Sequence, residues 1–282
     1  MQLFKILLLN LDNMGTFTSA FGIICLISFL VSALGFIYFV YFFSIGYAFS
    51  IAGMALATMI LFWGNMEIWG KAFCVLLVIY GLRLGIYLLV RESRSAAYKK
   101  ILRPETDANA NKRSLGFKVM LWIMVATLFI GQFAPVFFRI QNGSEPDVCA
   151  IVGFFIALAG VILEIWADAQ KSMLKRKNPN EFCRTGIYRI VRCPNYLGEI
   201  LLWTGVFLSG ITALDSLWQW VFAVWGYVLI LWVMFSGARR LELRQNKNYG
   251  DRPEYREYVT TVPIILPLVP LYSVARHKWL MA

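Results

Sequence analysis

The chain has 282 residues, of which 59% are hydrophobic and only 15% charged, with a mean hydropathy of +0.64 and a formal net charge of +11. This composition excludes an ordinary soluble domain, and because the cations are spread over several loops it also argues against a nucleic-acid-binding module. We therefore expect one integral membrane domain over 1–282, built from helices alone.

The first two spans are predicted from a charge-free stretch. No charged residue occurs between Asp12 and Glu67, and that interval is too long for one helix, since about 20 apolar residues cross the hydrocarbon. Two spans are placed near 18–41 and 46–64, with a turn at Ser44 and Gly46. Later apolar runs predict spans near 70–90, 116–138, 149–168, 196–213 and 217–236. The expected architecture is all-α, with seven transmembrane helices.

Basic residues predict the orientation. Of the 27 Lys and Arg residues, six lie in 92–114, seven in 169–195 and eight in 237–282, whereas 140–147 and 211–216 carry none. Cationic loops stay in the cytoplasm and are attracted to anionic lipid. With seven helices, all three basic segments fall on one face, so the basic loops and the C-terminus are expected to be cytoplasmic.

Metal and disulfide chemistry are not favoured. The five cysteines show no CxxC spacing, and His277, the single histidine, lies in the tail. These facts argue against a zinc site, a disulfide framework and a Ser-His-Asp triad. The amino-terminal stretch MQLFKILLLNLDNMG lacks a small-residue cleavage pattern, so we interpret it as an interfacial lead-in and not as a removed signal peptide.

The third span carries a polar stripe. Its sequence VIYGLRLGIYLLVR spaces Tyr80, Arg83, Tyr87 and Arg91 three or four residues apart, which places them along one side of a helix. Ionisable residues inside a span suggest a functional site. The alternative is that Arg91 reaches the interface and that the tyrosines are ordinary packing residues.

The fifth span ends in acidic and basic residues. In GVILEIWADAQKSMLKRK, Glu164 and Asp168 lie one turn apart and Lys175 follows two turns later. Two carboxylates at this spacing repel each other unless cations or donors oppose them. Arg83, the C-terminal arginines or the polar groups of a ligand would compensate; alternatively, the helix end simply reaches water.

The segment CRTGIYRIVRCPNYLGEILLWTG, at 183–205, predicts a pocket at the start of the sixth span. Pro194 favours the first helical turn, and Asn195 and Glu199 then lie one turn apart on one side. Amide and carboxylate groups at the floor and basic groups at the rim suit a nucleotide cofactor. Neither GxGxxG nor GxxxxGK[ST] occurs, so helix-borne side chains would hold it. The rim is expected to include Arg189 and Arg192, and Tyr188 is a further candidate in the same segment.

The tail FSGARRLELRQNKNYGDRPEYREYVTTVPIILPLVPLY adds further basic and aromatic residues. Arg239 and Arg240 follow the seventh span, and their guanidinium groups are available for phosphate. Tyr255 and Tyr258 flank a basic residue. The Pro-broken apolar stretch at 260–273 predicts a short re-entrant or surface-lying cytoplasmic cap over the mouth of the bundle.

These motifs resemble the steroid 5-alpha-reductase superfamily, and most of all its bacterial members of unassigned function. LRLGIYLLVR, EIWADAQ, GIYRIVRCPNYLGEI and the tail carry the resemblance, which covers roughly 76–92 and 155–270. Sterol C14 reductases, trans-2-enoyl-CoA reductases and, more distantly, isoprenylcysteine carboxyl methyltransferases are similar in their C-terminal architecture.

The resemblance implies an NADPH-dependent reductase of a C=C bond conjugated to a carbonyl in a hydrophobic lipid or steroid-like substrate. It implies substrate-side helices at 1–115 and a cofactor-binding half at 116–282. Tyr80 is implied as the proton donor, because a hydroxyl there stabilises charge developing on the carbonyl oxygen. Together with the patterns above, the candidate cofactor residues are Arg83, Tyr87, Arg91, Glu164, Asp168, Lys175, Tyr188, Arg192, Asn195, Glu199, Arg240 and Tyr255.

Two departures from the superfamily pattern leave questions open. Reductases acting on steroid enones carry a Gln-Glu pair on the second span, and the Glu holds the catalytic Tyr, but no carboxylate occurs here from 13 to 66. Glu67 precedes Tyr80 by 13 residues, about 20 Å along one helix, so it does not replace that acid. Cys193 stands where the family's RHPNY motif has His, which leaves the preference between NADPH and NADH open.

Two other functions remain as alternatives. One is an S-adenosylmethionine-dependent methyltransferase of a membrane-soluble thiol or acid, although methyltransferase relatives usually show consecutive glutamates where RRLELRQ has only Glu242. The other is a non-catalytic lipid- or nucleotide-binding membrane protein. We expect a bacterial inner membrane, or the endoplasmic reticulum in a eukaryote. Expected partners are a hydrophobic substrate and membrane lipids, without nucleic acid or an obligate protein partner.

Overall fold

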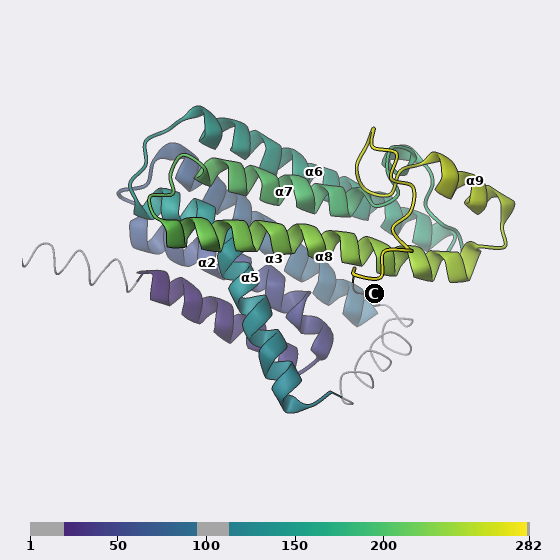
Figure 1. The fold of residues 1–282 in the computed structure, drawn as a ribbon, viewed down its shortest axis with the longest axis horizontal. Helices are drawn as coiled ribbons and strands as arrows, with labels where there is room; N and C mark the ends of the chain where they lie inside the picture. Colours follow the sequence, from purple (N-terminus) through teal and green to yellow (C-terminus); the bar gives the residue numbers. More distant parts are fainter. Residues whose placement is uncertain (1–19, 95–112, 281–282) are drawn as a thin grey trace, which may run out of the picture. The chain divides into compact units, whose positions relative to one another are not determined.

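The computed structural model describes residues 20–94 and 113–280, which form helices joined by turns, with no strand among them (Figure 1). The all-α class is therefore confirmed. The predicted amino-terminal lead-in falls outside the described residues. The first helix covers 20–32 and continues into two 3-10 turns, η1 (Ala33–Phe36) and η2 (Phe39–Phe42).

The remaining helices follow the predicted apolar runs and extend past them. Ser114 caps the helix after the basic loop by accepting a hydrogen bond from the Phe117 N–H, and Pro194 begins the helix after the CPNY motif. The helices are α2 (Ile45–Phe62), α3 (Ile68–Arg94), α5 (Leu115–Gln141), α6 (Val148–Lys177), α7 (Pro194–Gly210), α8 (Leu217–Tyr249) and α9 (Pro253–Thr261), with a 3-10 turn η4 (Gly186–Arg189) before α7.

Five stretches of the described chain are long and apolar enough to cross a membrane by length and composition: Phe39–Phe62, Ile68–Arg91, Leu115–Gln141, Val148–Lys177 and Leu217–Tyr249. These stretches indicate a multi-pass membrane protein. The predicted spans near 18–41 and 196–213 coincide with shorter helices, Ala20–Phe36 and Pro194–Gly210. Seven crossings therefore remain a prediction.

The chain divides into two compact units. Unit 1 consists of Met1–Ile151 and Phe207–Gly226, and unit 2 of Val152–Val206 and Tyr227–Ala282. These units do not follow the expected functional division at 115. That division concerns which residues meet substrate and cofactor, so it also stays a prediction.

In unit 1, small residues allow the helices to approach closely, as is common in membranes. A Cβ on Gly81 of α3 would lie 2.4 Å from the Ala48 carbonyl oxygen of α2, and one on Gly226 would lie 2.1 Å from the Gly131 carbonyl carbon of α5. The Ser28 hydroxyl donates to the Ala126 carbonyl at 2.9 Å. The first helix is thereby joined to α5.

In unit 2, α6 and α7 are in backbone contact. A Cβ on Gly160 would lie 2.5 Å from the Gly198 carbonyl oxygen, and one on Gly205 would lie 2.2 Å from the Gly153 carbonyl oxygen. The stretch after α9 packs on α7 and α8, where Ile264 and Ile265 are buried in a common hydrophobic cluster. This packing fixes the tail and the segment before α7 relative to α8.

Candidate functional site

A recess of about 230 Å³ lies in unit 2, between the C-terminal parts of α6 and α8 and the segment that leads into α7. Its walls combine cations, amides and aromatic rings, without a carboxylate. Such a set of donors suits an anionic ligand that also carries amide or hydroxyl groups. The lining residues are Lys171, Lys175, Phe182, Cys183, Tyr188, Arg192, Asn195, Leu241, Arg244, Gln245, Asn248 and Tyr249.

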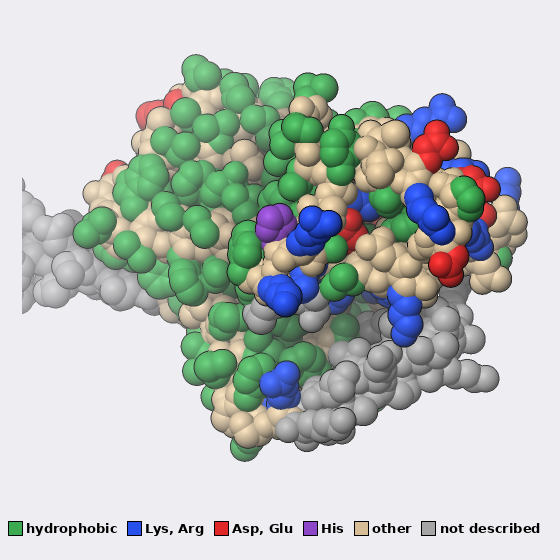
Figure 2. All heavy atoms as spheres, turned by 45° about the vertical axis from the view of Figure 1, so that its right-hand side comes forward, with side chains coloured by type: hydrophobic (Ala, Val, Ile, Leu, Met, Phe, Trp, Pro, Cys, Tyr) green, Lys and Arg blue, Asp and Glu red, His purple; other side chains and the backbone are tan. Residues whose placement is uncertain are grey.

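Helical spacing explains how two helices supply most of the polar groups. Lys171 and Lys175 lie four residues apart on α6, and Arg244 and Asn248 have the same spacing on α8, so each pair shares one helix face. Figure 2 shows Lys, Arg, Asp and Glu side chains gathered around α9, at the right of the view. The polar walls of the recess thus come mainly from the C-terminal parts of α6 and α8.

Lys175, a predicted cofactor residue, lines the recess with its three donors already used. Its ammonium donates to the Pro179 and Glu181 carbonyls, each at 2.8 Å, and to the Tyr249 hydroxyl at 3.1 Å. An ammonium has three donors. Lys175 therefore contributes positive charge to the recess, whereas a direct hydrogen bond to a ligand would require one of these bonds to break.

Arg192 is buried and holds the tail. Its guanidinium lies 3.1 Å from Glu242, also buried, and donates to the Tyr272 carbonyl. The other oxygen of Glu242 accepts the Val274 N–H at 2.9 Å. Within the described part of the chain, the buried Nε of Arg192 has no hydrogen-bond partner. Arg192 therefore lines the recess with a charge that is already paired inside unit 2.

Of the two residues predicted to act together on α7, Asn195 lines the recess and Glu199 does not. Asn195 is half-buried and lines the recess. Glu199 is buried one turn later, is not among the lining residues, and accepts a hydrogen bond from the Trp203 indole at 3.0 Å. Asn195 is therefore positioned to meet a ligand in the recess, while Glu199 lies within the helix packing.

The tyrosines around the recess act as hydrogen-bond donors. The Tyr188 hydroxyl donates to the Ala167 carbonyl at 3.2 Å, and the Tyr258 hydroxyl donates to the Tyr188 carbonyl at 2.6 Å. Burial, above all, raises the pKa of both phenols, so they stay protonated. Tyr255 does not line the recess; its hydroxyl donates to Asn246 at 2.7 Å, and its ring packs against Phe182. Burial raises the pKa of Tyr255 to about 12.

Cys193, the cysteine of the CPNY motif, faces apolar side chains. It is buried in the cluster formed by α7, α8 and the tail, and its backbone N–H donates to the Ile264 carbonyl at 2.9 Å. Burial raises the pKa of the thiol to about 12, against the opposing effect of Arg192. The thiol is therefore neutral and contributes packing, not charge.

Three other predicted cofactor residues of unit 2 lie outside the recess lining. Glu164 is buried on α6 beside Gly198, since a Cβ there would meet the Glu164 side chain at 3.0 Å. Asp168 is half-buried one turn later, and Arg240 is exposed on α8. The recess thus unites Lys175, Tyr188, Arg192 and Asn195 from the predicted set.

Sequence reasoning missed the other recess residues, among them the basic and amide side chains of Lys171, Arg244, Gln245 and Asn248. Asn195, Arg244 and Asn248 make no side-chain hydrogen bond to another described residue, so their polar groups are available to a ligand. The repeat of Arg244 and Asn248 at a spacing of four was the available signal. It went unused because α8 was expected to end near 236.

In unit 1, the polar stripe of α3 is buried to different depths. Tyr80 is fully buried, Arg83 and Tyr87 are half-buried, and Arg91 is exposed. The Tyr80 and Tyr47 hydroxyls form a 3.0 Å hydrogen bond in which either group is able to donate. The second span therefore gives Tyr80 a phenol as partner. Sequence reasoning overlooked Tyr47 because it searched that span for a carboxylate.

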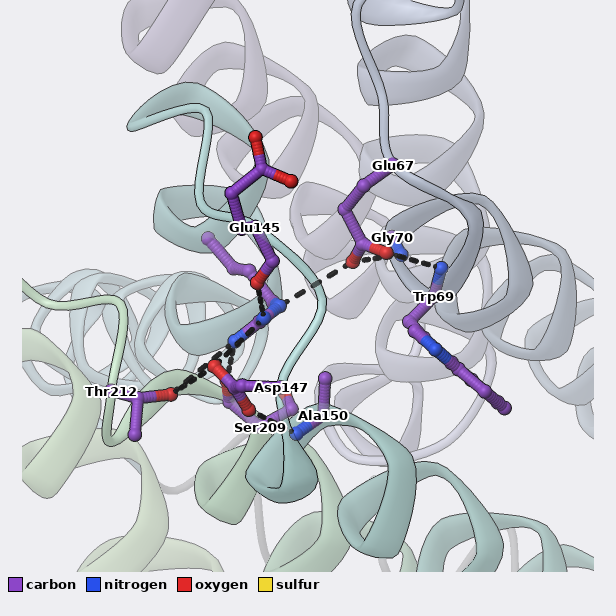
Figure 3. Close-up of polar contacts among 9 residues, drawn as sticks. Glu67, Trp69, Gly70, Glu145, Asp147, Ala150, Ser209 and Thr212 are labelled. Atoms are coloured by element: carbon purple, nitrogen blue, oxygen red, sulfur yellow. Dashed lines mark hydrogen bonds and ion pairs between the residues drawn. The ribbon is translucent and has the colours of Figure 1, made fainter.

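A second polar centre, also in unit 1, surrounds the buried Arg139 of α5 (Figure 3). All five guanidinium donors are used. The Nε–H faces Glu67 at 3.4 Å, and one terminal nitrogen donates to the Asp147 carboxylate at 2.9 Å and to the Glu145 carbonyl. The other terminal nitrogen donates to the Ser209 carbonyl at 2.9 Å and to Thr212 at 3.4 Å.

The carboxylates of this centre also cap helices. Glu67 accepts the Trp69 and Gly70 N–H groups at 2.6 and 2.7 Å, and Asp147 accepts the Ala150 N–H at 2.8 Å. Burial alone would raise the pKa of Asp147, but bonds from Thr212, Ala150 and Arg139 outweigh it and lower the pKa. Because every donor of Arg139 is occupied, the centre is a structural junction. A neighbouring recess of about 200 Å³ is lined in part by Glu67 and Glu145.

Comparison with known proteins gives a family. The model of a family described as "protein of unknown function (DUF1295)" matches residues 26–262. The chain belongs to the DUF1295 family. An uncharacterized protein of Schizosaccharomyces pombe is 36% identical over 86 residues, which span 30% of this chain and 24% of the relative. No solved structure was found to match the chain.

The DUF1295 match encloses the recess, the Tyr47–Tyr80 pair and the Arg139 centre, because all of their residues lie between 26 and 262. It ends before Pro263, whose carbonyl accepts the Arg192 N–H at 2.9 Å. The DUF1295 part of the chain therefore holds the whole recess, and the residues after it pack on that part.

Proposed function

We propose that the protein is an NADPH-dependent membrane reductase of a C=C bond conjugated to a carbonyl in a hydrophobic lipid or steroid-like substrate, as a member of the steroid 5-alpha-reductase superfamily. The observation that carries the proposal is the recess of unit 2. It presents the cations Lys171, Lys175, Arg192 and Arg244 together with three amide side chains and no carboxylate.

The residues of the recess fit part of NADPH. Small-molecule sites typically enclose roughly 300–1,000 Å³, so a recess of about 230 Å³ suits the phosphate-bearing part of a dinucleotide and not the whole cofactor. Arg244 would hold phosphate oxygens, Arg192 would add attraction through its charge, and Asn195 and Asn248 would hold hydroxyl or amide groups. Lys171 and Lys175 would add attraction through their charge.

In this proposal NADPH supplies the hydride, and the chain supplies a proton and its orientation. Tyr80 holds that proton on its hydroxyl, in a site from which its burial excludes water. Tyr47 orients the hydroxyl and, by donating in turn, stabilises the phenolate left after proton transfer. The polar residues that follow Tyr80 on α3, namely Arg83, Tyr87 and Arg91, then act as positioning residues for substrate or cofactor.

A methyltransferase using S-adenosylmethionine is the less favoured alternative. That cofactor carries a carboxylate and a sulfonium but no phosphate, so four cations around one recess suit it less well than NADPH. A protein that binds the nucleotide without catalysis would show the same binding behaviour and no turnover. Nucleotide binding and substrate turnover are therefore measured separately.

The same proposal includes the topology. The helices Ala20–Phe36 and Pro194–Gly210 would add two crossings to the five long apolar helices, giving seven. The three basic segments, the recess and the tail would then face the cytoplasm, with the residues after α9 as a cap, in a bacterial inner membrane. Protease accessibility of the loop at 178–193 in sealed vesicles of known orientation tests this arrangement.

The decisive experiment is ligand-dependent thermal unfolding of the detergent-purified protein. NADPH should raise the melting temperature, and Arg244→Gln or Asn195→Ala should remove most of that rise. The matched control is Arg176→Gln, an exposed position on α6 outside the recess. Stabilisation by S-adenosylmethionine alone, or an equal loss in the Arg176 variant, would overturn the assignment of the recess.

A further inference from the structure

The C-terminal segment Pro263–Leu280 has an inner face fixed to the helices of unit 2. Ile264, Ile265 and Val274 are buried against α7 and α8. Arg239 donates to the Ala275 and Leu280 carbonyls at 3.1 and 3.0 Å. Although the segment has no long helix, it is therefore held in one place along α8.

The outer face of this segment is apolar. Leu268 is fully exposed, and Trp279 is 67% exposed, with Val269 and Tyr272 also on the surface. Leu268 has a φ of 66°, which is rare for a bulky side chain, and Pro267 and Pro270 restrict the turn around it. The backbone thus presents the Leu268 side chain outward, although an apolar side chain gains nothing from contact with water.

The position along α8 sets the depth of the segment. The hydrophobic cluster that contains Ile264, Ile265 and Val274 also contains Ala238 and Leu241 of α8. The apolar run of α8 is predicted to end near 236, and Arg239 and Arg240 follow it. The segment therefore lies beside the part of α8 where hydrocarbon gives way to headgroups.

The charge of the segment matches an anionic surface. Arg276 and Lys278 are exposed beside Trp279, and the sequence from 258 to 282 contains no Asp or Glu. Trp and Tyr are enriched at membrane interfaces, and each cation near an anionic leaflet adds attraction. Irregular backbone is excluded from the lipid-exposed hydrocarbon centre but not from the interface.

We propose that the outer face of Pro263–Leu280 is a lipid-binding surface that inserts into the interface of an anionic leaflet. Leu268, Val269 and Trp279 enter the boundary of the acyl chains, and Arg276 and Lys278 bind lipid phosphates. This surface is independent of the proposed reductase activity. It also holds the Arg192–Glu242 pair and the tail at the membrane surface.

Site-specific photo-crosslinking of the full-length protein tests the surface. Benzoylphenylalanine is introduced at Leu268, at Trp279 or, as a control, at Glu257, an exposed position on the charged helix α9. The protein is placed in nanodiscs of equal parts phosphatidylglycerol and phosphatidylcholine and irradiated, and adducts are identified by mass spectrometry. Positions 268 and 279 should yield mainly lipid adducts, with an excess of phosphatidylglycerol, and position 257 should yield few.

Removing the cations tests the headgroup preference. Arg276→Gln and Lys278→Gln should each reduce the phosphatidylglycerol excess, by up to about fivefold, because one cation near an anionic surface contributes about 1 kcal/mol. Lipid adducts at 268 and 279 no more frequent than at 257 would overturn the proposal. Predominant crosslinks to another protein chain would do so as well, since they would identify a protein interface.

Discussion

The hydroxyl oxygens of Tyr47 on α2 and Tyr80 on α3 lie 3.0 Å apart, and both residues are buried. If Tyr80 donates the proton, Tyr80→Phe should lower kcat by about 10²–10⁴-fold with NADPH binding unchanged. Tyr47→Phe should give a smaller decrease, because Tyr80 keeps its own proton. Turnover of an enone substrate and NADPH-dependent thermal shifts measure the two effects. Equal rates in wild type and Tyr80→Phe would assign the proton to another group.

The buried pair of Arg192 and Glu242 predicts a large stability effect. Glu242→Gln should destabilise the protein by about 3–5 kcal/mol, because it leaves a buried guanidinium without its counter-charge. Thermal or denaturant unfolding in detergent measures the change. Glu254→Gln on the surface of α9 serves as the control and should change stability little.

Asp147 predicts a dependence of stability on pH. Its folded-state pKa is lowered, so its contribution is fully present above the unfolded value of about 3.9 and is lost as the pH falls through the lower folded value. The melting temperature of the wild type should therefore fall in that acidic window. Asp147→Asn should lie below the wild type at neutral pH and show a weaker acid dependence. Asp251→Asn, an exposed carboxylate on the α8–α9 turn, should follow the wild-type curve.

The buried thiol of Cys193 predicts selective labelling. With a pKa of about 12 it is almost wholly protonated at pH 8, and its burial also excludes reagents. In the folded protein Cys193 should remain unmodified by a maleimide, while the half-buried Cys149 reacts. Peptide mapping before and after unfolding measures this difference. Modification of Cys193 at the rate of Cys149 would mean that the tail leaves the start of α7 accessible.

The contact between α6 and α7 predicts the effect of a single methyl group. Gly160→Ala would bring its Cβ to 2.5 Å from the Gly198 carbonyl oxygen, and the overpacking should cost about 1–3 kcal/mol. Gly22→Ala is the matched control, because nothing lies within 4 Å of its Cβ, and alanine also favours a helix. The two variants should therefore shift the melting temperature in opposite directions or by clearly different amounts.

The helices were predictable because a long run of apolar residues indicates a segment that is stable in the hydrocarbon of a membrane. The expected spans 46–64 and 116–138 nearly coincide with α2 and α5. The helix ends were not predictable in this way, since α3, α6 and α8 continue through polar residues where hydropathy gives no signal. The split into two compact units depends on contacts between distant residues, which apolar periodicity does not encode.

The candidate site was predictable only where its residues are close in sequence. Tyr188, Arg192 and Asn195 were chosen from one short segment, and all three line the recess. Arg244 and Asn248 were missed because the recess depends on how far α8 extends beyond its span. The junction at Arg139 was missed because it joins residues that are far apart in sequence: Glu67 lies 72 residues from Arg139.

The saturated guanidinium of Arg139 has a consequence for motion within unit 1. It ties the start of α3, the end of α5, the start of α6 and the 209–212 stretch into one node. Displacing any one of these ends would leave at least one donor of the buried guanidinium without a partner. If unit 1 opens to admit a lipid-sized molecule, we therefore expect the helix ends near Arg139 to move least and the helix ends farthest from it to move most.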